Sequence, residues 1–234
     1  MIEEVLIYII ILITNIIQAL TGFAGTLLAM PLAVRLIGID SARIVLNFVG
    51  LVANAYLVCK GYKDINKKRI KEAIGWLISG MCIAYVMYKF IDSQILMYAY
   101  GVMIVVIALK KLIVKKELPP NEGVMKATLI LAGIAQGLFA SGGALLVIYL
   151  ATKTEDKNEF RSTAAMIWVL LCSLFVFQNL NSITVYDMKL TICAMVPLFV
   201  GVTVGNKLHS KVSQERFLKI AYVLVLISGV TLFL

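Results

Sequence analysis

The sequence predicts an all-α integral membrane protein made of two inverted repeats, each a broken or re-entrant helical hairpin plus three transmembrane helices. Three observations predict it: an apolar composition, recurring apolar runs, and a glycine-containing motif that occurs twice. Of the 234 residues, 61% are hydrophobic and 15% are charged, whereas soluble domains have roughly 25% charged residues. The mean hydropathy is +0.95. This composition excludes an ordinary soluble protein.

Apolar runs of membrane-spanning length occupy nearly the whole chain. A helix needs about 20 residues to cross the hydrocarbon core, and most runs fit one crossing each. Two of them, 5–37 and 124–152, are too long for a single crossing. The N-terminal residues MIEEV carry two acids and no basic region, so we expect no cleaved signal peptide. The runs are 5–37, 40–60, 72–90, 94–109, 124–152, 160–180, 188–208 and 215–234.

The two overlong runs contain the same motif. Residues 16–32 (IIQALTGFAGTLLAMPL) are loosely repeated 118 positions later as IAQGLFASGGALLVIYL. At this offset Gln18 matches Gln136 and Gly25 matches Gly143. Paired segments interrupted by glycine in the two halves of a membrane protein indicate a transport site.

The motif divides the chain into two halves of similar length. We expect a first transmembrane repeat over 1–114, a cytoplasmic linker over 115–123 and a second transmembrane repeat over 124–234, all in one membrane domain. Farther along each half the offset becomes 121, and Gly80 then matches Gly201.

The basic residues select between two topologies. Eight simple spans would place twelve Lys and Arg residues inside and ten outside. If each long run instead breaks and returns to its starting side, eighteen lie inside and four outside, which fits the preference of basic residues for the cytoplasmic side. Each half then crosses an odd number of times, so the repeats are inverted and both termini face outside. The predicted cytoplasmic loops are 60–71, 110–126, 153–161 and 207–219.

Several segments resemble one family of transporters. They are the first motif ending in AMPLA, the segment GLFASGGALLVIYL followed by EDKNEFR, and the closing VPLFVGVTVGNKLHSKVSQERFLKI, in which Pro197, Gly201, Gly205 and Leu208 carry the most specific pattern. The sequence resembles the TauE/SafE family of sulfite and sulfonate exporters. The resemblance implies a multi-pass carrier of small sulfur-containing or organic anions in the plasma membrane, namely a prokaryotic inner membrane.

The predicted helix breaks suggest how an anion is held. Backbone that leaves the helix at membrane depth must line a cavity or be buried in protein. Gly22 and Gly25, and likewise Gly142 and Gly143, permit the required dihedrals. Half-helices starting near Gly25 and Gly143 would direct N–H groups and positive dipole ends to the bilayer middle. The alternative is that these glycines serve close helix packing.

Uncharged polar side chains inside the spans complete the predicted site. Amides and hydroxyls can donate to sulfite or sulfonate oxygens, or they can cross-link helices. We favour substrate binding for the two glutamines, whereas cross-linking fits Asn47 and Asn54 at least as well. The polar candidates are Gln18, Thr21, Thr26, Asn47, Gln136 and Ser141, with Asn54 and Thr163 on the following helices.

The basic residues favour an anion as substrate, and the positions of the acidic residues disfavour a cation. Arg43 and Arg161, related by the 118-residue offset, each open the helix after a hairpin, where a guanidinium could attract oxyanions at an entrance or snorkel to headgroups. The thirteen acidic residues lie at span ends or in loops. Cation sites and proton relays usually need an intramembrane carboxylate, so a cation exporter is disfavoured.

Other function classes find little support. Ser141 lacks a histidine within a span to activate it, since the lone His209 falls in a basic loop. The four cysteines have no CxxC or metal-ligand spacing. We therefore expect no enzyme, no cofactor and no metal site. The partners are a small anionic substrate and membrane lipid, not nucleic acid; the sequence leaves open whether a homo-oligomer forms. We predict a secondary transporter working by alternating access, with a passive anion channel as the alternative.

Overall fold

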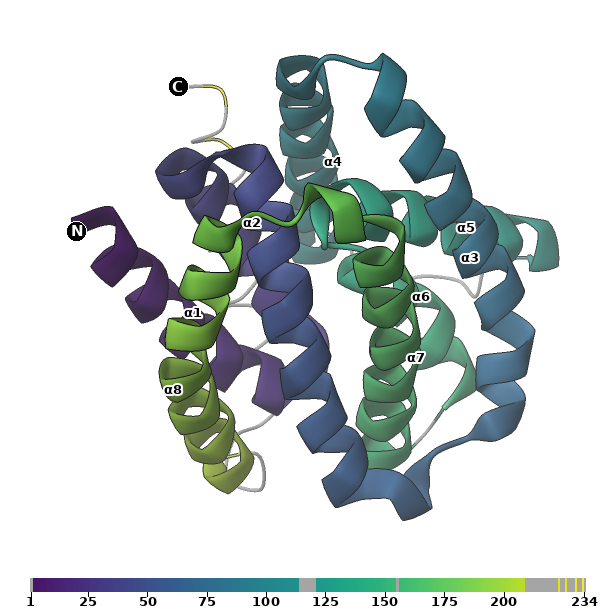
Figure 1. Cartoon of the computed structure of the whole chain (residues 1–234). Helices are drawn as coiled ribbons and strands as arrows, with labels where there is room; N and C mark the ends of the chain where they lie inside the picture. Colours follow the sequence, from purple (N-terminus) through teal and green to yellow (C-terminus); the bar gives the residue numbers. More distant parts are fainter. Residues whose placement is uncertain are drawn as a thin grey trace.

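The protein is a bundle of helices in every part of the chain that its structure, a computed structural model, describes (Figure 1). Most of the predicted span 215–234, His209 and most of the loop 207–219 lie outside this part, as do residues 115–120 of the predicted linker. The described residues are 2–113, 121–154 and 156–208, together with the single positions 223, 226, 230 and 233.

Six of the described helices are long and apolar enough to cross a membrane, namely α1, α2, α3, α5, α7 and α8. The helices are α1 (Ile2–Thr21), α2 (Ala24–Gly61), α3 (Lys67–Phe90), α4 (Ser93–Ile113), α5 (Glu122–Phe139), α6 (Gly143–Lys153), α7 (Lys157–Gln178) and α8 (Val185–Leu208), with short 3-10 turns at Tyr62–Asp64 and Leu180–Ser182. The loop predicted at 60–71 is thus mostly helical, because Asn66 caps α3 by accepting the N–H groups of Lys68 and Arg69.

Both overlong runs are interrupted at their glycine motifs. The first break comes at Gly22, where φ is +83°, and α2 begins two residues later at Ala24. The second comes after Phe139, where Ala140 adopts a left-handed φ of +52°. The sequence also separated 40–60 from the first run, but α2 continues through this boundary with a kink at Gly38, whose φ is +75°.

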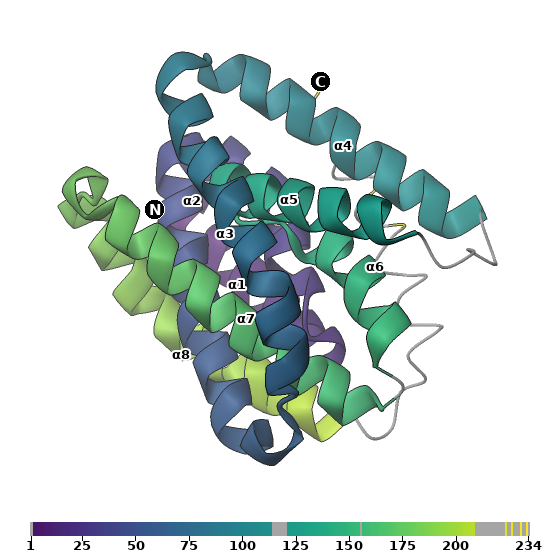
Figure 2. The same ribbon diagram turned by 90° about the vertical axis from the view of Figure 1, so that its right-hand side faces the viewer.

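The two breaks lie among helices that pair across the halves of the chain. Helix α1 packs along α8, α5 packs along α3, and α2 packs along α7. The two views of the ribbon show α1 beside α8 and α5 beside α3, with α4 at one edge of the bundle (Figures 1 and 2). Each of these helix pairs therefore joins a helix from the first half to one from the second.

Glycine lets the paired helices approach until their backbones touch. A Cβ on Gly80 of α3 would overlap the carbonyl oxygen of Ile130 on α5. A Cβ on Gly201 of α8 would lie 2.5 Å from the carbonyl oxygen of Leu12 on α1. Gly80 and Gly201 are the residues that match at the 121-residue offset, and Leu12 and Ile130 match at 118. The two helix pairs thus use corresponding residues with the halves exchanged.

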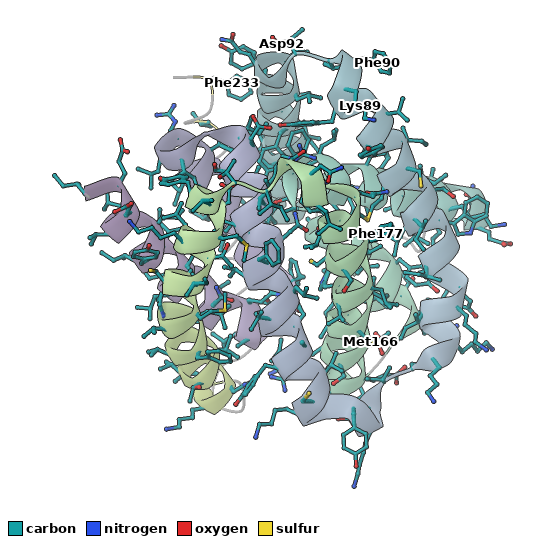
Figure 3. All side chains as sticks on the ribbon, viewed as in Figure 1. Lys89, Phe90, Asp92, Met166, Phe177 and Phe233 are labelled. Carbon is teal, nitrogen blue, oxygen red and sulfur yellow. The ribbon has the colours of Figure 1, made fainter. Side chains whose placement is uncertain are left out.

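The outer faces of the helices are apolar. On α8, Ile192 is 64% exposed and Val196 is 70% exposed, as expected for side chains that face lipid. Figure 3 shows Lys89, Phe90 and Asp92 around the connection between α3 and α4, at one end of the bundle. Polar loops at the bundle ends and apolar helix faces between them fit a membrane-embedded fold.

The close contact of α3 with α5 makes a testable prediction. Gly80→Ala should lower the free energy of unfolding by about 1–3 kcal/mol, the usual cost of overpacking, because the added methyl group meets backbone atoms that cannot rotate away. The measurement is the thermal unfolding midpoint of the full chain in detergent. Gly75→Ala, one turn away on the same helix, is the control, since a Cβ there meets nothing within 4 Å. Equal midpoints for the two variants would contradict the packing described.

Candidate functional site: a cavity between two helix breaks

At the first break, side chains replace the backbone partners that the interrupted helix lacks. The Thr21 hydroxyl accepts the N–H groups of Phe23 and Ala24 at 3.3 and 3.2 Å. The Gln18 Oε1 atom accepts the N–H of Gly25 at 2.9 Å. The amide nitrogen of Gln18 donates to the Gly22 carbonyl at 3.3 Å. The N-terminus of α2 is therefore capped by its own half of the protein.

The second break has the same plan with fewer caps. The Gln136 Oε1 atom accepts the N–H of Gly142 at 3.3 Å, as Gln18 does for Gly25. The N–H of Ala140 bonds back to the Gln136 carbonyl at 2.9 Å. In α6, the Leu146 N–H donates to the Gly142 carbonyl. The N–H groups of the first residues of α6, beginning with Gly143, have no partner within their helix.

The two breaks lie against each other. A Cβ on Gly143 would lie 2.6 Å from the carbonyl oxygen of Phe23, so only glycine allows the start of α6 to approach the first break. The Ser141 hydroxyl donates to the Thr26 carbonyl at 3.3 Å and accepts from the Tyr100 hydroxyl at 2.8 Å. The structure thus brings together the motif segments that the 118-residue offset relates.

A small cavity lies where the two breaks meet. Its volume is about 10 Å³, roughly the space that one water molecule needs and far below the roughly 300–1,000 Å³ of pockets for drug-sized ligands. Its polar lining consists of amide, hydroxyl, thiol and indole groups, and no charged side chain lines it. The lining residues are Gln18, Phe23, Thr26, Gly50, Asn54, Gln136, Gly143, Trp168 and Cys172.

A second hollow of similar size adjoins this cavity. Gln18, Thr26 and Gly50 line both spaces, and Gly25 lines the second. The described structure therefore places five of the predicted residues around this connected space: Gln18, Gly25, Thr26, Gln136 and Gly143. Thr21, Gly22, Ser141 and Gly142 form the breaks beside it.

The two glutamine amides already have protein partners. The Gln18 amide nitrogen donates to Asn54 Oδ1 at 3.0 Å, and the Gln136 amide nitrogen donates to Asn47 Oδ1 at 3.1 Å. Asn47 in turn donates to the Arg43 carbonyl at 2.9 Å. The cross-linking alternative therefore describes the contacts of Asn47 and Asn54. Thr163 accepts the backbone N–H of Asn66 at 3.0 Å, away from the cavity lining.

Arg43 is buried and bonds to the end of the second half's broken helix. Its side chain is 4% exposed, and its guanidinium donates to the Gly137 carbonyl at 2.8 Å. The guanidinium carbon lies 3.4 Å from the centre of the Tyr88 ring and 5.2 Å from that of Phe175. These contacts describe an arginine that is fixed within the protein.

Arg161 makes the matching contact with the first half. Its guanidinium donates to the Ala19 carbonyl at 3.1 Å and to Asn206 Oδ1 at 3.0 Å. Ala19 and Gly137 differ by 118 positions, as do Arg43 and Arg161. Each arginine thus binds a carbonyl near the C-terminal end of the broken helix in the opposite half, where the helix dipole favours a cation.

The cavity lining contains residues that the sequence analysis did not select. Trp168 and Cys172 lie on α7 at the positions that match Gly50 and Asn54 of α2 at the 118-residue offset. Of these four residues the sequence analysis named only Asn54, although the offset that relates Arg43 to Arg161 also relates both pairs. Tyr100, which is fully buried beside Ser141, lies in α4, and the sequence offered no signal for its contact.

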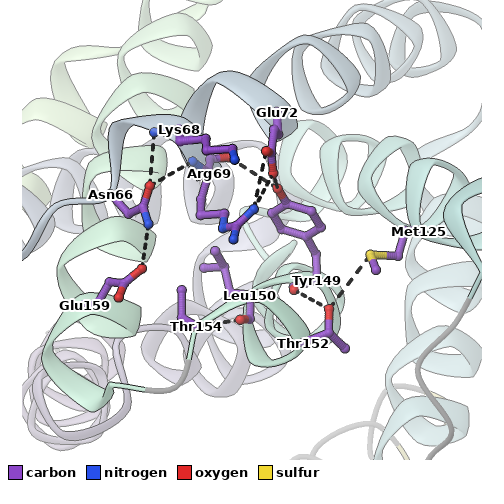
Figure 4. A network of polar contacts seen from close by, with 10 residues as sticks. All are labelled: Asn66, Lys68, Arg69, Glu72, Met125, Tyr149, Leu150, Thr152, Thr154 and Glu159. Carbon is purple, nitrogen blue, oxygen red and sulfur yellow. Dashed lines mark hydrogen bonds and ion pairs between the residues drawn. The ribbon is translucent and has the colours of Figure 1, made fainter.

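A polar network joins α3, α6 and α7 around the connection between α2 and α3 (Figure 4). Tyr149 of α6 donates to Glu72 at 2.9 Å, and Glu72 forms an ion pair with Arg69 at 3.0 Å. Asn66 donates to Glu159 of α7 at 2.7 Å. Helix α6 therefore starts at the cavity and is bonded to α3 farther along its length.

The arginine contact predicts a difference between two positions on α2. Arg43→Gln should lower the free energy of unfolding by about 2 kcal/mol, because it leaves the buried Gly137 carbonyl without its charged donor. Arg35→Gln is the matched control, since Arg35 is exposed and such surface changes usually stay within about 0.5 kcal/mol. Thermal unfolding of the two variants in detergent measures the difference. A stable Arg43→Gln variant would show that the contact contributes nothing to the fold.

No group of His, Cys, Asp or Glu suited to a metal ion occurs among the described residues.

Comparison with known proteins identifies the family of the chain. No curated protein and no solved structure matches the chain. The model of the sulfite exporter TauE/SafE family matches residues 7–232, nearly the whole chain. With six described helices able to cross a membrane, the protein is a multi-pass protein of the cell membrane, and it belongs to the TauE/SafE family of sulfite exporters.

Proposed function

We propose that the protein is a secondary transporter that exports small sulfur-containing or organic anions, such as sulfite or sulfonates, by alternating access. The carrying observation is the cavity where the two helix breaks meet, lined by polar groups without a charged side chain. Membership of the TauE/SafE family supports the same class of substrate. The outward direction of transport and the alternating-access mechanism are part of this proposal.

The two halves act as inverted repeats in this proposal. Its support is the exchange of matching contacts: Arg43 with Gly137 and Arg161 with Ala19. The glycine contacts of α3 with α5 and of α8 with α1 follow the same exchange. In transporters built from inverted repeats, the substrate site lies at the repeat interface near the bilayer midplane, formed by discontinuous helices. The cavity described above is lined by residues from both halves, which supports this proposal.

The start of α6 is the principal anion donor in this proposal. Its first N–H groups carry the positive end of the helix dipole, and Gly143 lines the cavity. The start of α2 contributes less, because Thr21 and Gln18 already accept its N–H groups. Gln18 and Gln136 accordingly set the shape of the site by holding the breaks. The absence of a carboxylate from the lining fits an anion, which a nearby negative charge would repel.

The contacts at two ends of the bundle supply the barriers that alternate. One is the network of Tyr149, Glu72 and Arg69. The other is the contact of Tyr88 with Asp40 and Arg43. Breaking one while the other stays intact would open the cavity to one side at a time. A passive anion channel is the second candidate, and it differs in having both barriers open together.

Transport by purified protein distinguishes these two functions. Proteoliposomes loaded with sulfite should show saturable flux and should exchange internal for external anion, because a carrier binds substrate in each cycle. Sulfite, taurine, sulfoacetate and thiosulfate are the anions to compare. Flux that rises linearly with concentration and shows no exchange would support the channel instead.

Substitutions at the two helix breaks test whether the transported anion passes through the cavity. Gly143→Val and Gly25→Val should abolish flux, since side chains there would meet Phe23 and Gln18. Gly123→Ala is the control, because its Cβ makes only an ordinary contact at 3.6 Å. Thermal unfolding establishes that each variant is folded. Wild-type flux through both valine variants would assign these glycines to packing alone and overturn the proposed site.

The inverted arrangement predicts which residues face the cytoplasm. In a variant without native cysteines, Lys157→Cys should react with a membrane-impermeant thiol reagent only from the inside, and Lys89→Cys only from the outside. The reason is the strong bias of basic residues toward one side of the membrane. Labelling of intact cells and of inverted vesicles gives the answer. Reaction of Lys157→Cys from the outer face would restore eight simple spans.

A further inference from the structure

One buried donor beside the cavity has no hydrogen-bond partner among the residues that the structure describes. Trp168 of α7 is 4% exposed, and its indole N–H makes no hydrogen bond to any other group of the described structure. Trp168 also lines the cavity between the two breaks. An unpaired buried donor costs about 1–3 kcal/mol, so most buried donors in native proteins are paired.

The two halves of the protein differ at this position. Gly50 of α2 matches Trp168 at the 118-residue offset, and both line the cavity. A Cβ on Gly50 would lie 3.6 Å from Thr26 Cγ2 and 3.7 Å from Cys172 Sγ. Glycine thus leaves space on the α2 side of the cavity, while tryptophan supplies a ring and a donor on the α7 side.

We propose that the Trp168 indole N–H binds an oxygen of the transported anion, and that it makes the site selective for oxyanions over halides. This inference rests on the proposed function and names a specificity residue for it. The start of α6 contacts one part of the anion, and Trp168 contacts another. An oxyanion with several acceptor oxygens, such as sulfite or a sulfonate, satisfies both donors. A halide offers one atom and no directional acceptors, so it gains less from two separated donors.

The composition of the chain allows a direct test. The chain has two tryptophans, and the other, Trp76, is 39% exposed on α3 and does not line the cavity. In Trp76→Phe, all tryptophan emission comes from Trp168. Sulfite titrated into this protein in detergent should produce a saturable change in emission, whereas chloride at matched ionic strength should not. The same titration of Trp168→Phe, which retains Trp76, is the control and should show no saturable change.

Transport by Trp168→Phe provides the second measurement. This variant keeps an aromatic ring and removes the N–H. We expect the KM for sulfite to rise about ten-fold or more, because a hydrogen bond to a charged group contributes at least that much to affinity. The ratio of the chloride concentration that halves sulfite flux to the sulfite KM should then fall, because the variant discriminates less between sulfite and chloride. A role in packing alone would lower the thermal midpoint without changing this ratio.

The outcomes separate the inference from the proposed function. An unchanged sulfite KM in Trp168→Phe overturns the inference while leaving anion transport intact. The inference is also overturned if the Trp76→Phe protein transports sulfite but its Trp168 emission does not change at saturating sulfite. If the wild-type protein carries no anion, the proposed function fails, and sulfite-dependent emission of Trp168 still reports the contact. If Trp168→Phe does not fold, the Trp76→Phe titration alone decides.

Discussion

The structure depends on how it satisfies the backbone polar groups that are freed when two helices stop inside the apolar part of the protein. Lipid offers these groups no hydrogen bonds, so protein side chains must provide them. Thr21 and Gln18 do so for the start of α2, and Gln136 does so for Gly142. The second break is less completely capped than the first. In the proposed site, this imbalance makes the start of α6 the main donor to the anion.

Close helix contacts hold the rest of the bundle around these breaks. In a membrane, burial of apolar surface from water does not drive helices together, so association depends on tight packing and interhelical hydrogen bonds. The pairs α3 with α5 and α1 with α8 meet at glycines whose missing side chains allow backbone contact. The same pairs join the first half of the chain to the second. The cavity is therefore enclosed by contacts between the halves, and neither half forms it alone.

The sequence predicted the helical class and the positions of the two breaks, because apolar length and glycine spacing are local properties. It did not predict partners. Substrate binding by Gln18 and Gln136 stays a prediction. The bonds of their amides to Asn54 and Asn47 could not be predicted, because such pairing depends on which helices pack together. The boundary between the runs 5–37 and 40–60 coincides with the kink at Gly38, but no loop separates the two segments, because one residue with positive φ redirects the helix without creating a polar loop. Tryptophan was overlooked since its indole suits a core as well as a site.

The exchange of arginines between the halves has a consequence for how the chain is made. The carbonyl of Ala19, near the beginning of the chain, receives its guanidinium from Arg161, 142 residues later. The Gly137 carbonyl is served by Arg43, which is synthesised long before it. During translation the first break therefore emerges without its cation and must wait until α7 has been inserted. Both arginine contacts are therefore complete only late in biosynthesis, and two halves made as separate chains would have to associate in the membrane to form them.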